Sequence, residues 1–179
     1  MDTLIRADVE AAAERLAGHV RLTPVLAVEA GVVGPGPVTL KLEHLQHTGS
    51  FKARGALSAL LAAGELPSSG VVAASGGNHG LAVAWAASRL GVPATVFVPA
   101  TAPASKVEPL RALGADVRLV GERYSQALAA SLEHQVASGA LAVHAYDEPA
   151  VVAGQGTVGL ELAEQAEDAD TVLVAVGGG

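Results

Sequence analysis

The middle of the chain alternates short apolar runs with longer segments whose apolar residues recur at helical spacing. The short apolar run at 71–74 is typical of a buried strand, and further strands are predicted at 94–98, 116–120 and 141–144. The segments between them predict helices at 78–90, 104–113 and 124–137. Strand–helix alternation with short connections indicates a parallel sheet with helices on both faces. We therefore expect a four-stranded parallel α/β unit from residue 71 to about residue 146.

The regions on either side of this unit predict a second set of elements. Helices are expected at 5–16, 52–63 and 158–165, and strands at 38–42 and 171–176. We expect residues 1–69 and 148–179 to form one larger domain, split in the sequence around a small α/β domain at 70–147. The last predicted strand leads into the three glycines at 177–179. A buried strand and a glycine turn normally lead into further structure, so the larger domain is expected to be incomplete.

Composition narrows the function classes. Apolar residues make up 50% of the chain and charged residues 16%, which is typical of a globular protein. The net charge is −7 and no basic run occurs, so nothing favours nucleic-acid binding. The sequence has no cysteine, which excludes disulfides, thiolate metal sites and cysteine nucleophiles. No signal peptide or membrane span is predicted, and the cytoplasm is the expected location.

The octapeptide TGSFKARG at 48–55 contains the first candidate for chemistry. Lys52 falls in the first turn of a predicted helix, where the helix dipole disfavours a cation. That placement lowers the pKa of the amine and suits a lysine that must react in its neutral form. The alternative is a solvated surface lysine, and the surrounding octapeptide is what favours the reactive role.

The glycine-rich segment ASGGNHG at 74–80 lies between a predicted strand and a predicted helix. Free backbone N–H groups at a helix start bind carboxylates and phosphates. Asn78 is placed to cap the helix and to offer its amide to a ligand. A plain glycine turn with an asparagine cap is the alternative reading of the same residues.

Three further patterns are weaker. The segment GQGTVG at 154–159 matches a dinucleotide-binding pattern, but several residues separate it from the preceding strand, so no such site is expected. The glycines at 177–179 let backbone amides surround a phosphate, or form an ordinary turn. His44 and His47 have the spacing of one helical face but lack an evident third ligand, so no metal site is expected.

These segments follow one another in a characteristic order: KLE at 41–43, TGSFKARGA at 48–56, SGGNHG at 75–80, AGQGT at 153–157 and the glycines at 177–179. In that order they closely resemble the threonine/serine dehydratases, which are tryptophan-synthase-β-like (fold-type II) pyridoxal-phosphate (PLP) enzymes and include serine racemase among their relatives. The resemblance runs from about Arg21 to Gly179. It implies an α/β chain with two parallel-sheet domains, the larger one incomplete here, an active site between them, and a homodimer.

The resemblance also implies how PLP is held. Lys52 would bind the cofactor covalently and carry the α-proton of the substrate. Phe51 would pack beside the cofactor ring, and Asn78 would hydrogen-bond its phenolic oxygen. The beginning of the phosphate-binding loop would be formed by Gly177, Gly178 and Gly179. No metal ligand is implied within this stretch.

The substrate implied by the resemblance is a small β-hydroxy amino acid, threonine or serine. Its carboxylate would be bound by the loop residues Ser75, Gly76, Gly77, Asn78 and His79. Loss of the α-proton and the β-hydroxyl group would then give a 2-oxo acid and ammonia. Because PLP acts as the electron sink, the protein mainly supplies orientation and proton transfer.

Three alternatives stay open. Racemases of this group carry a serine where this chain has Gly76, so dehydration is favoured over serine racemisation. Another β-elimination or β-replacement enzyme of the same fold is the second alternative, although the Ala53-Arg54 pair after Lys52 fits dehydratases better. The third is a truncated, non-catalytic fragment or binding module. A chain that truly ended at Gly179 is expected to fold poorly and show little catalysis, because strand edges stay uncovered.

Overall fold

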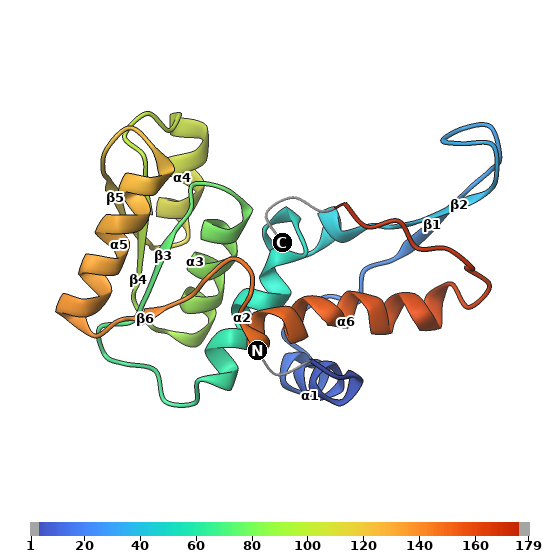
Figure 1. The fold of residues 1–179 in the computed structure, drawn as a ribbon, viewed down its shortest axis with the longest axis horizontal. Helices are drawn as coiled ribbons and strands as arrows, with labels where there is room; N and C mark the ends of the chain where they lie inside the picture. The colour runs from blue at the N-terminus through green and yellow to red at the C-terminus, as the bar shows by residue number, and fades with distance from the viewer. Residues whose placement is uncertain (1–3, 176–179) are drawn as a thin grey trace.

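The computed structural model describes residues 4–175, and its path from the N-terminal helix to the last helix is shown in Figure 1. The elements in chain order are α1 (Arg6–Leu16), β1 (Val25–Val28), β2 (Val38–Lys41), η1 (Glu43–Leu45), η2 (His47–Gly49), α2 (Lys52–Ala62), β3 (Val71–Ala74), α3 (Asn78–Leu90), β4 (Ala94–Val98), α4 (Ala104–Ala112), β5 (Asp116–Leu119), α5 (Tyr124–Ser138), β6 (Leu141–Ala142) and α6 (Pro149–Gln165).

The sheet formed by β3 to β6 is parallel throughout and has the strand order β5-β4-β3-β6. Helices α3 and α4 cover one face and α5 covers the other (Figure 1). Every residue of β4 is buried, as expected for a central strand enclosed on both faces. The predicted four-stranded parallel unit is confirmed, with β6 shorter than expected.

Helix α2 joins this unit to the rest of the molecule. Its apolar side chains, including Leu57 and Leu60, share one buried cluster with Val83 of α3 and Val96 of β4. Through Leu16 the same cluster also reaches α1, so apolar burial continues beyond the parallel sheet. Because α2 begins at Lys52, this packing also determines where the candidate lysine stands.

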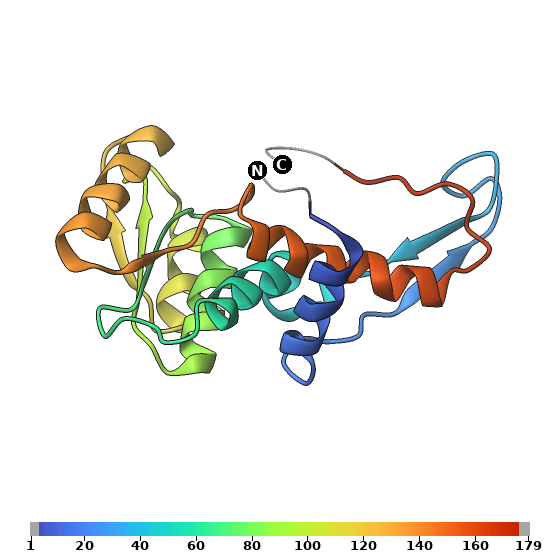
Figure 2. The same cartoon turned by 60° about the horizontal axis from the view of Figure 1, so that its bottom comes forward.

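Helix α6 begins at Pro149, nine residues before the predicted start at residue 158. Proline suits the first turn of a helix, and the helix then continues through Gly154, which was expected to lie outside it. The glycine allows α6 to approach α2 closely: a Cβ at position 154 would lie 2.5 Å from Ser58 Cβ. Figure 2 shows α6 lying along both α1 and α2. The predicted start of the helix was wrong because Gly154 allows contact between two helices and does not interrupt α6.

The second sheet is a two-stranded antiparallel hairpin of β1 and β2, with Leu26 paired to Leu40. Strand β1 was not predicted, because four residues carry little periodic signal. In the part of the chain that the structure describes, this sheet is antiparallel, where a second parallel sheet was expected. Residues 171–175 of the expected last strand form no strand and have exposed side chains, since no neighbouring strand among the described residues offers them hydrogen bonds.

Candidate functional site

Lys52 is the first residue of α2, and a turn of unusual backbone geometry leads into it. Thr48 has φ of 61° and Gly49 has φ of 75°, so two consecutive residues lie in the left-handed region. This conformation is costly for a β-branched residue such as threonine and persists only where the surrounding structure enforces it. The turn that presents Lys52 is therefore held in place by its context.

The amine of Lys52 is fixed by a contact across the molecule. Its Nζ donates a hydrogen bond of 2.7 Å to the backbone carbonyl oxygen of Ala145, in the segment between β6 and α6. The same Nζ lies 5.1 Å from the ring centroid of Phe51. Partial burial lowers the pKa of the Lys52 amine below its ordinary value. The direction of this pKa shift agrees with the expectation from the sequence, and burial is its cause.

A cavity of about 350 Å³ opens beside this amine. Its walls come from the start of α2, the segment after β6, the first half of α6 and the described end of the chain. Phe51 and Lys52 line it together with Ala145, Tyr146, Asp147, Val151, Val152, Gln155, Val174 and Ala175. Such walls are largely apolar and carry a few polar groups, which is typical of a small-molecule site.

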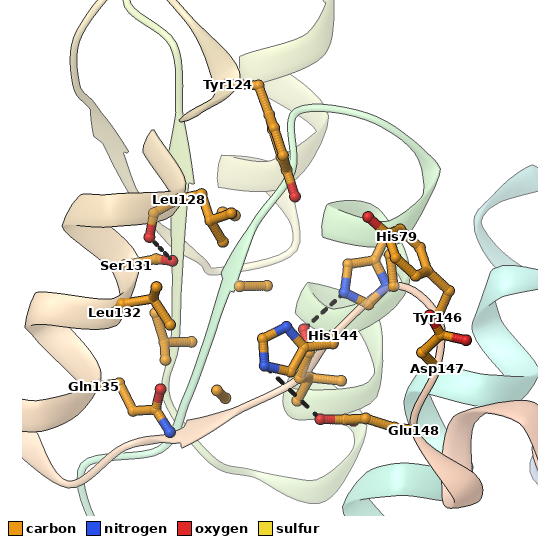
Figure 3. Close-up of a pocket in the computed structure, with 16 residues that line it drawn as sticks. His79, Tyr124, Leu128, Ser131, Leu132, Gln135, His144, Tyr146, Asp147 and Glu148 are labelled. Carbon is orange, nitrogen blue, oxygen red and sulfur yellow. Dashed lines mark hydrogen bonds and ion pairs between the residues drawn. The ribbon is translucent and has the colours of Figure 1, made fainter. Parts of the chain in front are cut away.

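A second cavity of about 340 Å³ adjoins the first and is shown in Figure 3. It lies between α5 and the strands β3 and β6, and it shares residues 145–147 with the first cavity. The buried His79 lines it, and His79 Nε2 bonds to the carbonyl oxygen of Val143 at 2.8 Å. Burial lowers the pKa of His79; the Val143 hydrogen bond raises it, and the charges of Lys52 and His144 lower it further.

The glycine-rich loop lies where predicted, between β3 and α3, and its glycines make close contacts. A Cβ at Gly80 would overlap the carbonyl oxygen of Ser75, and a Cβ at Gly76 would lie 2.8 Å from Val98 Cγ1. Asn78 is exposed and is the first residue of α3; the N-cap is Gly77, so the expected asparagine cap is wrong. The backbone N–H of Gly77 donates to Ser75 Oγ at 3.2 Å.

The structure brings only some of the predicted site residues together. Phe51 and Lys52 line one cavity, and His79 lines the adjoining one. The remaining loop residues, Ser75, Gly76, Gly77 and Asn78, line neither of these two cavities. Gly177, Gly178 and Gly179 lie outside the described residues.

Residues 145–147 border both cavities and were not predicted to belong to the site. Asp147 has φ of 61°, which makes it, with Thr48, one of two non-glycine residues with positive φ within 4–175. Aspartate tolerates this conformation better than most residues, so an aspartate between a strand and Glu-Pro was the available sequence signal. Thr48 thus lies in the turn that leads into Lys52, and Asp147 lines the same cavity as Lys52.

One member of the histidine pair at 44 and 47 packs against an aromatic ring. His47 stacks on Trp85 of α3, with ring centroids 4.7 Å apart and an interplanar angle of 18°. Within residues 4–175 no group of three or more His, Asp or Glu side chains is placed to hold a metal ion. The same range contains no helix long and apolar enough to cross a membrane.

Residues 16–179 match the family model described as pyridoxal-phosphate dependent enzyme. The chain belongs to this family of PLP-dependent enzymes. The resemblance recognised in the sequence is thereby confirmed, and so is the α/β fold class. PLP is therefore the cofactor that the site around Lys52 is expected to hold.

The similar proteins include a threonine ammonia-lyase, a threonine deaminase and an amino-acid racemase. The L-threonine ammonia-lyase of Geobacter sulfurreducens is 42% identical over 177 residues, which cover 96% of this chain and 43% of that protein. Among solved structures, a threonine deaminase from T.th. is 40% identical, with a TM-score of 0.82 over 91% of this chain and 52% of that one. A PLP-dependent aspartate racemase is 36% identical, with a TM-score of 0.87 over 95% of this chain and 54% of that one. The chain thus spans about half the length of these relatives.

The residues around Lys52 fit the cofactor of this family. PLP carries an aldehyde, and a lysine amine with a lowered pKa is the group that reacts with it. Two hydroxyl oxygens in the turn before the lysine, Thr48 Oγ1 and Ser50 Oγ, are buried without a hydrogen-bond partner among residues 4–175. Unpaired buried hydroxyls are costly unless a ligand or water satisfies them. The cavity of about 350 Å³ falls in the size range of small-molecule sites.

Proposed function

We propose that this chain carries the lysine-bearing part of a PLP-dependent threonine/serine ammonia-lyase. The observation that carries the proposal is the placement of Lys52: a partly buried amine of lowered pKa, held by Ala145, at the wall of a cavity lined by Phe51. The 42% identity to an L-threonine ammonia-lyase supports the choice of reaction. The substrate class is a β-hydroxy amino acid, and the products are a 2-oxo acid and ammonia.

Residues around Lys52 would hold the cofactor and transfer the substrate α-proton. When bound, PLP supplies an electron sink for the negative charge that develops on the substrate α-carbon. Lys52 would hold PLP and, once displaced by the substrate amine, take the α-proton on Nζ. The hydrogen bond to the Ala145 carbonyl oxygen holds that nitrogen at the cavity wall, to which Val151 and Val152 contribute apolar surface.

The loop at 75–79 would bind the substrate carboxylate through the N–H groups at the start of α3, where the helix dipole favours an anion. Phe51 would pack against the cofactor ring, and the Asn78 amide would donate to its phenolic oxygen. The glycines at 177–179 would contribute backbone N–H groups for its phosphate. These roles come from the resemblance.

Racemisation is the second candidate, because the structural match to an aspartate racemase is close, at a TM-score of 0.87. A racemase needs a proton donor on the substrate face opposite the lysine. The position at which relatives carry a serine for this purpose is Gly76 here. A side chain at this position would collide with Val98, since a Cβ would lie 2.8 Å from Val98 Cγ1. This contact favours elimination over racemisation.

Residues 70–147 are proposed to be a small domain that moves as a unit, with 1–69 and 148–179 in a larger PLP-binding domain. The substrate cavity would lie between them, since Lys52 and Ala145 come from the two sides. A cytoplasmic homodimer is proposed from the resemblance. Light scattering of the purified native chain and fractionation of its source cells test these two assignments.

Product analysis tests the reaction. The full native chain, loaded with PLP, is supplied with L-threonine and L-serine, and the 2-oxo acid and the D-enantiomer are both measured. The proposal expects 2-oxo acid with little D-enantiomer, loss of both in Lys52→Ala, and unchanged turnover in Lys106→Ala, which alters an exposed lysine of α4. Formation of the D-enantiomer as the main product would assign the racemase function instead.

A further inference from the structure

Four charged side chains form a cluster around Arg54 of α2. This α2 ion cluster consists of Lys41, Glu43, Arg54 and Glu161. Arg54 follows Lys52 by two positions in the same helix. Because an α-helix turns by about 100° per residue, side chains two positions apart point in nearly opposite directions. Lys52 and Arg54 thus extend from opposite sides of α2.

Arg54 uses its whole guanidinium group in this cluster. Its side chain has no solvent exposure, and it donates to both carboxylate oxygens of Glu43, at 2.9 and 2.8 Å. It also donates to both oxygens of Glu161, at 2.6 and 2.9 Å. Further bonds run to Thr157 Oγ1 at 3.2 Å and to the carbonyl oxygen of Arg21 at 3.3 Å. Two bidentate pairs fix the plane of the guanidinium as well as its position.

Lys41 completes the charge balance on the strand side. Its Nζ contacts Glu161 Oε2 and donates to Gln165 Oε1 and to the carbonyl oxygen of Thr23, both at 2.7 Å. Two cations therefore face two carboxylates. Although burial opposes the charge of Glu161, its hydrogen bonds with Arg54 and Lys41 hold the pKa of that carboxyl below its usual value. The carboxyl group of Glu161 therefore stays ionised at neutral pH.

The cluster joins four elements: β2 through Lys41, η1 through Glu43, α2 through Arg54 and α6 through Glu161. Apolar packing brings α2 against its neighbours through shape alone, whereas hydrogen bonds to charged groups are directional as well. A buried ion cluster often adds little net stability over well-packed apolar residues, because desolvation offsets the attraction. What it adds here is a defined rotation of α2 against its neighbours.

That rotation determines where the lysine amine lies. An extended lysine side chain places Nζ well outside the helix radius of about 2.3 Å, so a helix rotation of roughly 10° displaces the amine by about 1 Å. A displacement of that size in a reacting group reduces a rate by up to about a hundredfold. The alignment of Lys52 is thus sensitive to contacts on the opposite side of α2.

We propose that Arg54 is a positioning residue: held by Glu43 and Glu161, it sets the rotation of α2 and so aims Lys52 Nζ into the cavity. This inference rests on the proposed function of Lys52 as the reactive lysine. Arg54 acts only through Lys52.

Two variants separate alignment from folding. Arg54→Lys keeps the charge but loses the two bidentate pairs. A fourfold variant, Lys41→Met, Glu43→Leu, Arg54→Met and Glu161→Leu, replaces the whole cluster by apolar side chains and is expected to stay folded. The matched control is Arg111→Lys, which changes an exposed arginine of α4. Circular dichroism and the thermal midpoint establish that each variant is folded.

The first readout needs no cofactor. The full native chain, free of PLP, is treated with trace acetic anhydride across a pH series, and labelling of Lys52 is measured by mass spectrometry relative to the exposed Lys106. We expect the Lys52-to-Lys106 ratio to change by about threefold or more in both cluster variants, since the amine leaves its contact with Ala145, and to stay unchanged in Arg111→Lys.

The second readout is steady-state kinetics of the PLP-loaded native chain with threonine. We expect kcat to fall about tenfold or more in both cluster variants while KM stays within about twofold, because alignment rather than binding is lost. A folded cluster variant with the parent's labelling ratio and kcat would overturn the proposal. If the parent itself shows no lyase activity, the proposed function fails, and the labelling ratio still decides whether Arg54 aims Lys52.

Discussion

The backbone N–H of Gly55 in α2 donates to the side-chain oxygen of Gln155 in α6, over 3.2 Å. The two helices meet here without room for a methyl group, because a Cβ at Gly55 would collide with the Gln155 amide and lie 2.9 Å from the Val151 carbonyl oxygen. This contact lies one helical turn after Lys52, at the wall of the candidate site. Close approach of α2 and α6 is therefore a requirement of the site as well as of the fold.

Replacing Gly55 by alanine is expected to destabilise the protein by about 1–3 kcal/mol, since the backbone of α6 has to move. Denaturant unfolding of the native chain measures the change. The matched control is Gly159→Ala in the same helix pair, where a Cβ meets nothing within 4 Å and φ is not positive. There we expect a gain of about 0.5–1 kcal/mol from the better helix propensity of alanine. Equal effects at both positions would contradict the close-contact account.

Gly76→Ser is expected to destabilise by about 1–3 kcal/mol, because the new Cβ would lie 2.8 Å from Val98 Cγ1. Val98→Ala removes the obstructing methyl groups, so the double variant should lose less stability than the two single losses added together. A double-mutant cycle by thermal unfolding measures this coupling. Strictly additive losses would show that Val98 is not what excludes a side chain at position 76.

Stability should depend on pH through His79, which is buried with a lowered pKa. The unfolded chain then binds a proton more readily than the folded chain, so stability is full above the unfolded histidine value of about 6.5 and falls as the pH drops below it. His79→Gln should reduce this acid limb, that is, the loss of stability as the pH falls below about 6.5. His44→Gln, which changes a histidine at the protein surface, should leave it unchanged.

His47 contributes to the same limb, because burial first and then the charges of Arg21 and Arg89 lower its pKa. The double variant His47→Gln, His79→Gln should therefore be flatter than either single variant. Urea unfolding between pH 5 and 8 measures the parent and these variants. An acid limb unaffected by both substitutions would show that neither histidine is held neutral by the fold.

Thr48 adopts φ of 61°, a conformation in which asparagine is favoured over threonine. Thr48→Asn is expected to raise the free energy of unfolding by about 0.5–1 kcal/mol, because it relieves backbone strain. Thr101→Asn, at an exposed threonine with an ordinary φ, should stay within about 0.5 kcal/mol of the parent. Denaturant melts check both, and a loss of stability in Thr48→Asn would mean that the threonine side chain is itself needed in the turn.

Elements with a strong local signal were predictable from the sequence. The run at 71–74 is continuous and apolar and is bounded by turns, so its burial in a parallel sheet followed directly. The strand at 94–98 was predictable as the next strand in the same strand–helix alternation. The start of α6 was not predictable in this way, because Gly154 has the local pattern of a helix breaker, whereas its role is contact with Ser58 of a helix about a hundred residues earlier. Contacts of that range leave no local pattern.

The same distinction applies to the site. Lys52 stands in a distinctive octapeptide, and its position at the start of a helix was predictable. Its contact with Ala145 was not, because a backbone carbonyl is an acceptor whatever the side chain. Nor was the burial of Arg54, since an arginine is normally exposed and its partners Glu43 and Glu161 come from other elements.

We propose Lys52 as the residue that binds PLP. The most direct measurement is borohydride reduction of the native chain after PLP is added, followed by peptide mapping of the reduced adduct. The account predicts a visible absorption band before reduction and a single adduct on Lys52, with neither Lys41 nor Lys106 modified to a comparable extent. A band with the adduct on another lysine, or no band from the full native chain, would contradict it.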